Sequence, residues 1–469
     1  MIGDYMLALN PKYRLSKARS NIFFYSFDKE NLNLTDQKCI HPNTAVILSF
    51  FNGNNSMDEI KSAVMHLFDL SENSYNQQIE EFFQEWNDYF IDVNQQVRFE
   101  DPINYIIPAD EVDLTKINLE KPIYIGYNIT QKCSGRKCIY CYAETADVRK
   151  INEMSIEHID GLLKEMASLK VEFVNLGGGD PLASRNVYHI LEILSEAGIF
   201  VHLSTKQFVN QSVAEKLTKA GLRKMQFSID CLDNSLSKRL TGVSDFASRA
   251  INSIKLLIKN GISVSINSVV TALNINDIPN LVDRLVSLGI KKIGLSQYNR
   301  SGYHHNDILF VTKAQIKKLY DYILDFQISN NDVDISLSSS YTLDENQNAK
   351  GLDGFLNRPI CSAGKTSLMI MPDGSVIPCE QIPCDEPYIL GNVGRQGILG
   401  VWNSKIFRDF FVPEQEKFNG SICRDCDAFK LCILEKGWCF RDAWKAYGTI
   451  YEANPACPKA KDRKGKRLF

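Results

Sequence analysis

The segment IYIGYNITQKCSGRKCIYCY, residues 123–142, organises the rest of this sequence. Its first residues are β-branched and aromatic, which predicts a buried strand. A loop follows and carries Cys133, Cys138 and Cys141. Three thiolates on one loop can hold three irons of a [4Fe–4S] cluster, and because the loop offers no fourth cysteine, one iron stays open for another ligand. A structural zinc site, which usually closes with four ligands, is the alternative.

The same strand opens a repeated alternation of short β-branched runs and helical segments. The predicted strands cover residues 123–127, 172–176, 200–203, 224–228, 263–269 and 292–295, and the predicted helices lie near 155–168, 185–197, 211–219, 246–259, 277–288 and 313–328. Such alternation predicts a parallel sheet with right-handed crossovers. Six units indicate an α/β domain over residues 119–340, a partial (β/α)6 TIM-like barrel with its chemistry at the carboxyl ends of the strands.

Glycine and polar residues gather at these strand ends. The second strand is followed by NLGGGDPL, residues 175–182, where glycine allows a ligand to approach the backbone closely. Polar residues that end or follow the later strands are Ser204, Ser228, Asp230, Asn267 and Arg300.

The loop and the glycine segment together resemble the radical S-adenosylmethionine (SAM) superfamily, whose loop reads C-x3-C-x-aromatic-C and whose next strand ends in GGEP. The tetrapeptide CIYC at 138–141 matches the second half of that loop. Two features depart from the pattern: four residues separate Cys133 from Cys138, and Asp180 replaces the glutamate.

This resemblance implies a [4Fe–4S] cluster on Cys133, Cys138 and Cys141 and a SAM site beside it. The implied SAM contacts are Tyr140, Gly177, Gly178, Gly179, Asp180, Ser204, Ser228, Asn267 and Arg300. Asp230 is a candidate catalytic acid, either on the substrate side or structural. In the implied reaction an electron from the cluster cleaves SAM to methionine and a 5′-deoxyadenosyl radical, which takes a hydrogen atom from an unactivated carbon.

Residues 350–469 form a cysteine-rich region that resembles the SPASM domain, an auxiliary module with two iron–sulfur clusters. The matching positions are Cys361, Gly374, Cys379, Cys423, Cys426, Cys432, Cys439 and Cys457, with six residues rather than three between Cys432 and Cys439. The resemblance implies one cluster on Cys423, Cys426, Cys432 and Cys457, and another on Cys361, Cys379 and Cys439. Either Cys384 supplies the fourth ligand of the second of these clusters, or the fourth iron stays open for a substrate thiolate. A pair of zinc ribbons is the alternative.

Residues 1–100 predict a winged-helix-like α+β domain, and residues 101–118 a linker. Helices are expected over 41–51, from the capping residue Ser56 to about Phe68, and over 75–89, with a strand before them and another at 90–93. The order resembles the PqqD-type peptide-recognition element, which implies binding of a leader peptide as an added edge strand. The second helix carries a single lysine and the third is acidic, which argues against nucleic-acid binding.

The absence of targeting signals predicts a cytoplasmic protein. The chain has 469 residues, a net charge of −3 and 13 cysteines, which point to metal or redox chemistry where disulfides are disfavoured. It shows no signal peptide and no apolar run that could cross a bilayer, so neither a membrane nor nucleic acid is an expected partner.

The three regions together resemble maturases of ribosomally made peptides, such as the sactipeptide and ranthipeptide thioether synthases. This implies three [4Fe–4S] clusters, SAM, a precursor peptide, an external electron donor of flavodoxin or ferredoxin type, and a cysteine thioether as the product. Alternatives are a carbon–carbon or carbon–oxygen crosslink, or epimerisation, for which Cys231 is the one candidate hydrogen donor in the barrel. A zinc-stabilised binding protein without catalysis is the alternative of another class.

Overall fold

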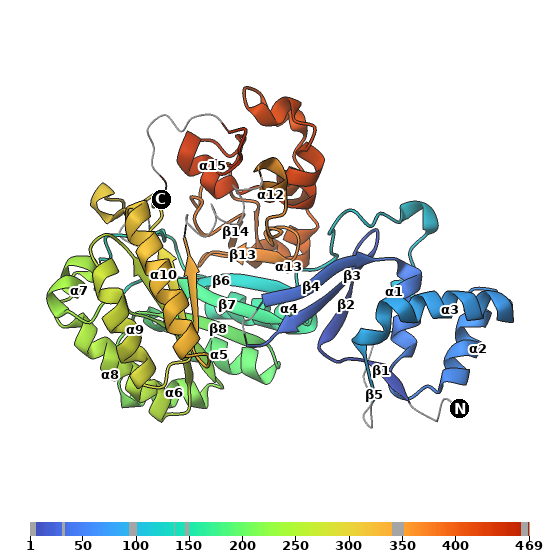
Figure 1. Ribbon diagram of the computed structural model, residues 1–469, viewed down its shortest axis with the longest axis horizontal. Helices are drawn as coiled ribbons and strands as arrows, with labels where there is room; N and C mark the ends of the chain where they lie inside the picture. Colours follow the sequence, from blue (N-terminus) through green and yellow to red (C-terminus); the bar gives the residue numbers. More distant parts are fainter. Residues whose placement is uncertain are drawn as a thin grey trace. The chain divides into compact units, whose positions relative to one another are not determined.

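The computed structural model describes residues 6–30, 33–92, 101–135, 137–145, 150–339, 351–460 and 468. The chain folds as two compact units, Met1–Glu120 and Lys121–Phe469 (Figure 1). The expected domain boundaries at 100, 340 and 350 lie outside the described residues. Among the residues that the structure describes, no helix is both long and apolar enough to span a bilayer.

The first unit combines an antiparallel sheet with three helices. Its strands are β1 (Leu7–Leu9), β2 (Tyr13–Lys17), β3 (Ile22–Asp28), β4 (Asn33–Ile40) and β5 (Phe90–Asp92), and its helices are α1 (Pro42–Phe50), α2 (Met57–Leu67) and α3 (Glu72–Trp86). The sheet order is β2-β3-β4, and β1 pairs with β5. Ser56 begins α2 with a complete capping box, because its side chain and that of Glu59 satisfy each other's backbone N–H groups.

Residues 101–118, which the sequence predicts as a linker, pack in part against the first unit. Tyr105 is buried and Ile107 nearly so, and both pack into the core of the first unit beside Phe24 and Trp86. Ala18 and Leu119 form an isolated bridge that ties the end of this stretch back to the unit. The free energy gained by burying these two large apolar side chains outweighs the tendency of the prolines and acids to form turns.

The second unit is built on parallel strands in the order of the sequence. These are β6 (Tyr124–Thr130), β7 (Phe173–Gly178), β8 (Phe200–Thr205), β9 (Lys224–Ser228), β10 (Ser263–Val270), β11 (Lys292–Gln297) and β12 (Asp334–Ser338). The first six coincide with the predicted strands, which confirms the partial barrel. Strand β12, parallel to β11, was not predicted.

Amphipathic helices connect these strands. They are α4 (Ile156–Ser168), α5 (Val187–Glu196), α6 (Gln211–Lys219), α7 (Asn234–Thr241), α8 (Phe246–Lys259), α9 (Ile278–Ser287) and α10 (Lys313–Ser329). All except α7 match predicted helices. Helix α7 has only two leucines among eight mostly polar residues, so its apolar face is too short to predict a helix from the sequence.

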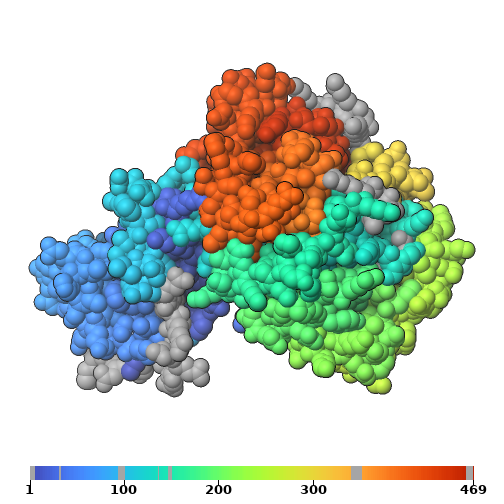
Figure 2. All heavy atoms as spheres, turned by 180° about the vertical axis from the view of Figure 1, so that it is seen from behind, coloured from blue at the N-terminus to red at the C-terminus, as the bar shows by residue number. Residues whose placement is uncertain are grey.

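The cysteine-rich region continues the same sheet. Strand β13 (Ser367–Ile370) pairs in parallel with β6, and β14 (Ser375–Ile377) and β15 (Gly391–Asn392) follow in antiparallel pairing. Its helices are α12 (Gly351–Leu356), α13 (Val393–Trp402), α14 (Lys405–Phe411) and α15 (Phe440–Tyr447). Figure 2 shows this region, in orange and red, packed directly on the green residues of the barrel.

Candidate active site

The loop with the three cysteines is held against the glycine segment at the end of β7. Gly178 has φ +132°, and a Cβ built on it would lie 2.0 Å from the carbonyl oxygen of Thr130. A Cβ on Gly179 would lie 2.4 Å from the oxygen of Lys132. The backbone therefore needs glycine here so that the residues just before Cys133 can approach, in addition to any approach by a ligand.

Helix α7 anchors the other half of the loop. The backbone N–H groups of Lys137 and Ile139 donate to the carbonyl oxygens of Thr241 and Leu240, at 3.0 and 3.1 Å. On the opposite side the Ser301 hydroxyl donates to the carbonyl oxygen of Cys141 at 2.7 Å. Hydrogen bonds to α7 and from Ser301 thus fix a loop whose described residues contain no helix or strand.

Asp180 stabilises the backbone around the cysteine loop. Its carboxylate accepts hydrogen bonds from the Thr205 hydroxyl at 2.7 Å and from the backbone N–H of Lys206 at 2.9 Å. Its own N–H donates to Lys132 at 2.8 Å. The side chain is almost fully buried, and it joins the ends of β7 and β8 beneath the cysteine loop.

A cavity of ≈ 360 Å³, the strand-end cavity, opens at the carboxyl ends of the strands. The predicted site residues that line it are Cys133, Cys138, Tyr140, Cys141, Gly177, Gly178, Gly179, Asp180, Ser204, Ser228 and Asn267. Lining residues that the sequence analysis did not single out include Lys137, Tyr142, His202, Lys206, Gln226, His304 and Glu380. The structure thus gathers the three thiols, the glycine segment and several strand-end polar groups around one space.

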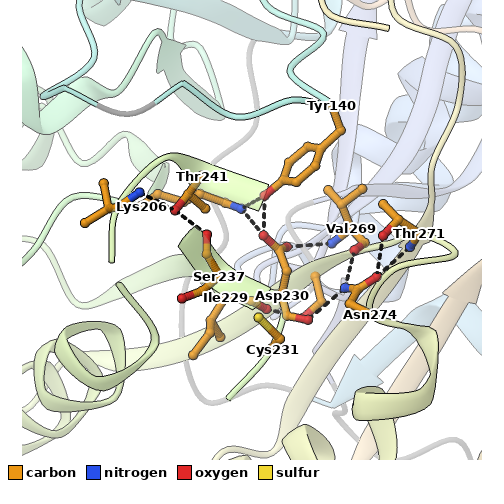
Figure 3. A network of polar contacts seen from close by, with 12 residues as sticks. Tyr140, Lys206, Ile229, Asp230, Cys231, Ser237, Thr241, Val269, Thr271 and Asn274 are labelled. Atoms are coloured by element: carbon orange, nitrogen blue, oxygen red, sulfur yellow. Dashed lines mark hydrogen bonds and ion pairs between the residues drawn. The ribbon is translucent and has the colours of Figure 1, made fainter. Parts of the chain in front are cut away.

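A buried polar network forms one wall of this cavity. Lys206 forms an ion pair with Asp230, and both contact the hydroxyl of Tyr140 (Figure 3). The second carboxylate oxygen of Asp230 accepts the N–H of Val269 at 2.9 Å. Burial and the negative charge of Asp230 raise the pKa of Tyr140 well above its usual value, so its hydroxyl stays protonated. The network joins the cysteine loop to the ends of β8 and β10.

Asp230 itself faces this network and is not among the residues that line the cavity. Its position fits the structural alternative of the prediction better than a role beside the substrate. The neighbouring Cys231 is buried among Leu240, Tyr298 and other apolar residues, and its pKa is raised to about 12, chiefly by burial. It does not line the cavity either, which removes the structural basis for a hydrogen donor there.

Arg300 and Cys384 also lie away from their expected positions. Arg300 pairs with Asp307 at 3.2 Å, its N–H donates to the carbonyl oxygen of Leu468, and it is not part of the cavity lining. Cys384 is buried in an apolar group with Met371 and Ile377.

The first auxiliary site is a second cavity, of ≈ 280 Å³, lined by Cys361, Cys379 and Cys439. Glu380 lines both this cavity and the strand-end cavity, as does Asn175. The Tyr142 hydroxyl donates to Glu380, whose pKa is raised by burial. One carboxylate therefore lies at the boundary between the two cavities, although nothing in the sequence marked it except its place next to Cys379.

The second auxiliary site brings together Cys423, Cys426, Cys432 and Cys457. Burial raises the pKa of Cys423 to about 11, and the other three thiols add to this through their charge, which places all four within electrostatic reach. In the described part of the chain, no three His, Cys, Asp or Glu side chains converge tightly enough to hold a single metal ion.

Comparisons with known proteins agree with this arrangement. Residues 127–285 match the model of the radical SAM superfamily, and residues 361–427 match that of an iron-sulfur cluster-binding domain, SPASM. The AdoMet-dependent heme synthase of Methanosarcina barkeri is 23% identical over 72% of this chain and 96% of its own length. A PqqA peptide cyclase of Methylobacterium is 24% identical over 72% of this chain and 86% of its own.

Among solved structures, Streptococcus suis SuiB bound to its precursor peptide SuiA has a TM-score of 0.67 at 19% identity. The match covers 96% of this chain and 100% of that one, so it includes both units. At this identity the likeness establishes a shared fold. With the two matched segments and the gathered cysteines, the chain carries a radical SAM domain over residues 127–285 and an iron–sulfur cluster-binding SPASM domain over residues 361–427.

Proposed function

We propose that this enzyme modifies a ribosomally made precursor peptide, using SAM and three [4Fe–4S] clusters, and that the product contains a cysteine thioether. The observation that carries the proposal is the strand-end cavity, where three loop thiols, the glycine segment and the shared carboxylate Glu380 surround one space. The clustered thiols also suit the reducing cytoplasm.

The residues around the strand-end cavity divide into two groups. Cys133, Cys138 and Cys141 would hold the catalytic cluster, which supplies the electron that cleaves SAM. The glycine backbone at the end of β7, with Ser204 and Ser228, offers polar groups to the amino-acid and ribose parts of SAM. Lys206 and Asp230 keep the loop in place through their contacts with the hydroxyl of Tyr140.

The first unit supports a peptide as the substrate. Its sheet leaves β4 with β3 as its one strand neighbour among the described residues, so an extended peptide can pair with the free side of β4. The match to the heme synthase covers 96% of that protein but only 72% of this chain. The match to SuiB, whose structure contains a precursor peptide, covers 96% of this chain and therefore includes the first unit. A leader peptide bound at β4 would deliver its core to the second unit.

The first auxiliary site supports a thioether over other crosslinks. Three cysteines line its cavity, and the buried Cys384 lies in an apolar group, so a substrate cysteine can supply a further thiolate. Glu380 lines both cavities and can accept the proton of that cysteine. Carbon–carbon or carbon–oxygen crosslinks remain the alternative products.

The test is anaerobic turnover with a cysteine-containing precursor peptide, followed by mass spectrometry and thiol alkylation. A thioether predicts a loss of two hydrogens and a cysteine that resists alkylation. The same mass loss with an alkylated cysteine would instead indicate another crosslink. If the reduced, reconstituted enzyme releases no 5′-deoxyadenosine with or without peptide, the proposal fails as a whole.

A further inference from the structure

Arg358, just after α12, makes direct contact with the second auxiliary site. Its Nη2 lies 3.3 Å from the sulfur of Cys432, 2.6 Å from the carbonyl oxygen of the same residue and 2.9 Å from that of Gly437. The guanidinium also stacks on Phe355, with its carbon 4.4 Å from the ring centroid. Its Nη1 also donates to the carbonyl oxygen of Phe355 at 3.2 Å, so four acceptors and one ring hold a half-buried positive charge against a cysteine sulfur.

At the first auxiliary site, by contrast, positive and negative charges balance one another. Arg441 lines that cavity, but its Nε donates to a carboxylate oxygen of Asp442 at 2.8 Å, so its charge is paired. The nearby Lys445 adds positive charge and Glu380 adds negative charge. No carboxylate in the described residues pairs with Arg358, so its charge acts on the thiolates of the second site without compensation.

We propose that Arg358 raises the reduction potential of the cluster held by Cys423, Cys426, Cys432 and Cys457, and so makes it the preferred resting place of an electron within the cysteine-rich region. This rests on the proposed function, because it requires that the four thiols hold a cluster. Reduction adds one negative charge to the cluster, and a nearby cation with a hydrogen bond to a ligand sulfur stabilises that charge.

Other charges near this site act more weakly. An open hollow beside Cys426 is lined by Asp425, Asp427 and Lys430, all of which are exposed. Water and salt screen exposed charges, whereas the guanidinium of Arg358 contacts the sulfur of Cys432 directly. Lys430 therefore offers a matched control, since it is a cation at the same site without a hydrogen bond to a ligand.

The experiment is a redox titration of the full, reconstituted chain followed by electron paramagnetic resonance, with SAM added to identify the signal of the catalytic cluster. In Arg358→Gln, the ratio of reduced to oxidised second cluster at a fixed potential should fall about tenfold, which equals about 59 mV for one electron. Lys430→Gln should leave the ratio within about twofold of wild type. Arg358→Lys keeps the charge but loses the forked contacts, and should fall between the two.

An unchanged ratio in an iron-replete Arg358→Gln chain, or a change no larger than in the Lys430 variant, would overturn the inference. Should Arg358→Gln lose iron, Arg358→Lys decides, and a wild-type ratio there would equally overturn it. A wild-type chain with iron for fewer than three clusters would instead count against the proposed cofactor set, and absence of 5′-deoxyadenosine against the proposed function.

Discussion

Substitution of Gly178 by alanine tests how the catalytic loop is positioned. The residue has φ +132°, a conformation that costs a non-glycine residue on the order of 1–3 kcal/mol. The added Cβ would also lie 2.0 Å from the oxygen and 3.1 Å from the carbon of the Thr130 carbonyl. The backbone of Thr130 cannot rotate away as a side chain can. The segment from Thr130 into the cysteine loop must therefore move, and Cys133 must move with it.

The expected result is selective loss of one cluster. Reconstituted wild type should bind about twelve irons, and Gly178→Ala about eight, because the auxiliary cysteines lie in a separate part of the unit. Release of 5′-deoxyadenosine should fall at least about a hundredfold. The apo chain should lose about 2–4 kcal/mol of unfolding free energy in denaturant titration.

Gly161→Ala is the matched control. Gly161 lies in α4, is exposed, and has no atom within 4 Å of the added Cβ. Alanine in a helix interior should stabilise the chain by about 0.5–1 kcal/mol and leave iron content and SAM cleavage unchanged. A Gly178→Ala chain with full iron content and wild-type cleavage would refute the idea that this glycine sets the position of the loop.

Four further substitutions separate the roles of the sites. Cys141→Ala should abolish 5′-deoxyadenosine release, whereas Cys426→Ala should lose peptide product but keep part of that release in the same chromatographic assay; equal losses would contradict separate roles. Asp230→Asn leaves the partly buried Lys206 without its counter-charge, which should cost about 3 kcal/mol in chemical denaturation and weaken SAM binding in calorimetry. A stability within about 0.5 kcal/mol of wild type would argue against the network. Glu380→Gln should bind SAM normally and release 5′-deoxyadenosine without crosslinked peptide, and full product yield would exclude this carboxylate as the proton acceptor.

The sequence predicts the barrel well because its buried strands are short, β-branched and regularly spaced between amphipathic helices. It predicts less of the first unit. Strand β4, NLTDQKCI, is mostly exposed and polar, and β2 is short, so neither carries the alternation that marks a strand. Both form because β3, whose residues are nearly all buried, needs a partner on each side.

Helix α7 shows why the support of the site was harder to predict than its cysteines. Its contribution is two backbone carbonyl oxygens, from Leu240 and Thr241, that accept hydrogen bonds from the cysteine loop. Backbone acceptors leave no mark on residue identity, so no motif reports them. The cysteines, by contrast, must be cysteine to hold iron, and their spacing is therefore visible in the sequence.

The strand-end residues follow a physical rule that separates the useful predictions from the misplaced ones. Alternate residues of a strand face the same side, so Ser204 in β8 and Ser228 in β9 share the cavity face with His202 and Gln226, two positions earlier. This alternation can be read from the sequence, and it would have identified His202 and Gln226 as further residues of the cavity.

The rule ends where the strand ends. Asp230 lies two residues beyond the last residue of β9, and Arg300 three beyond that of β11, so alternation no longer fixes their direction. Each turns to a charged partner instead, Lys206 for the first and Asp307 for the second. Lys206 is also one residue past its strand, yet it reaches the cavity wall because Asp230 and Tyr140 hold it there. Beyond a strand end, the local charge pairing decides which side chain reaches the site.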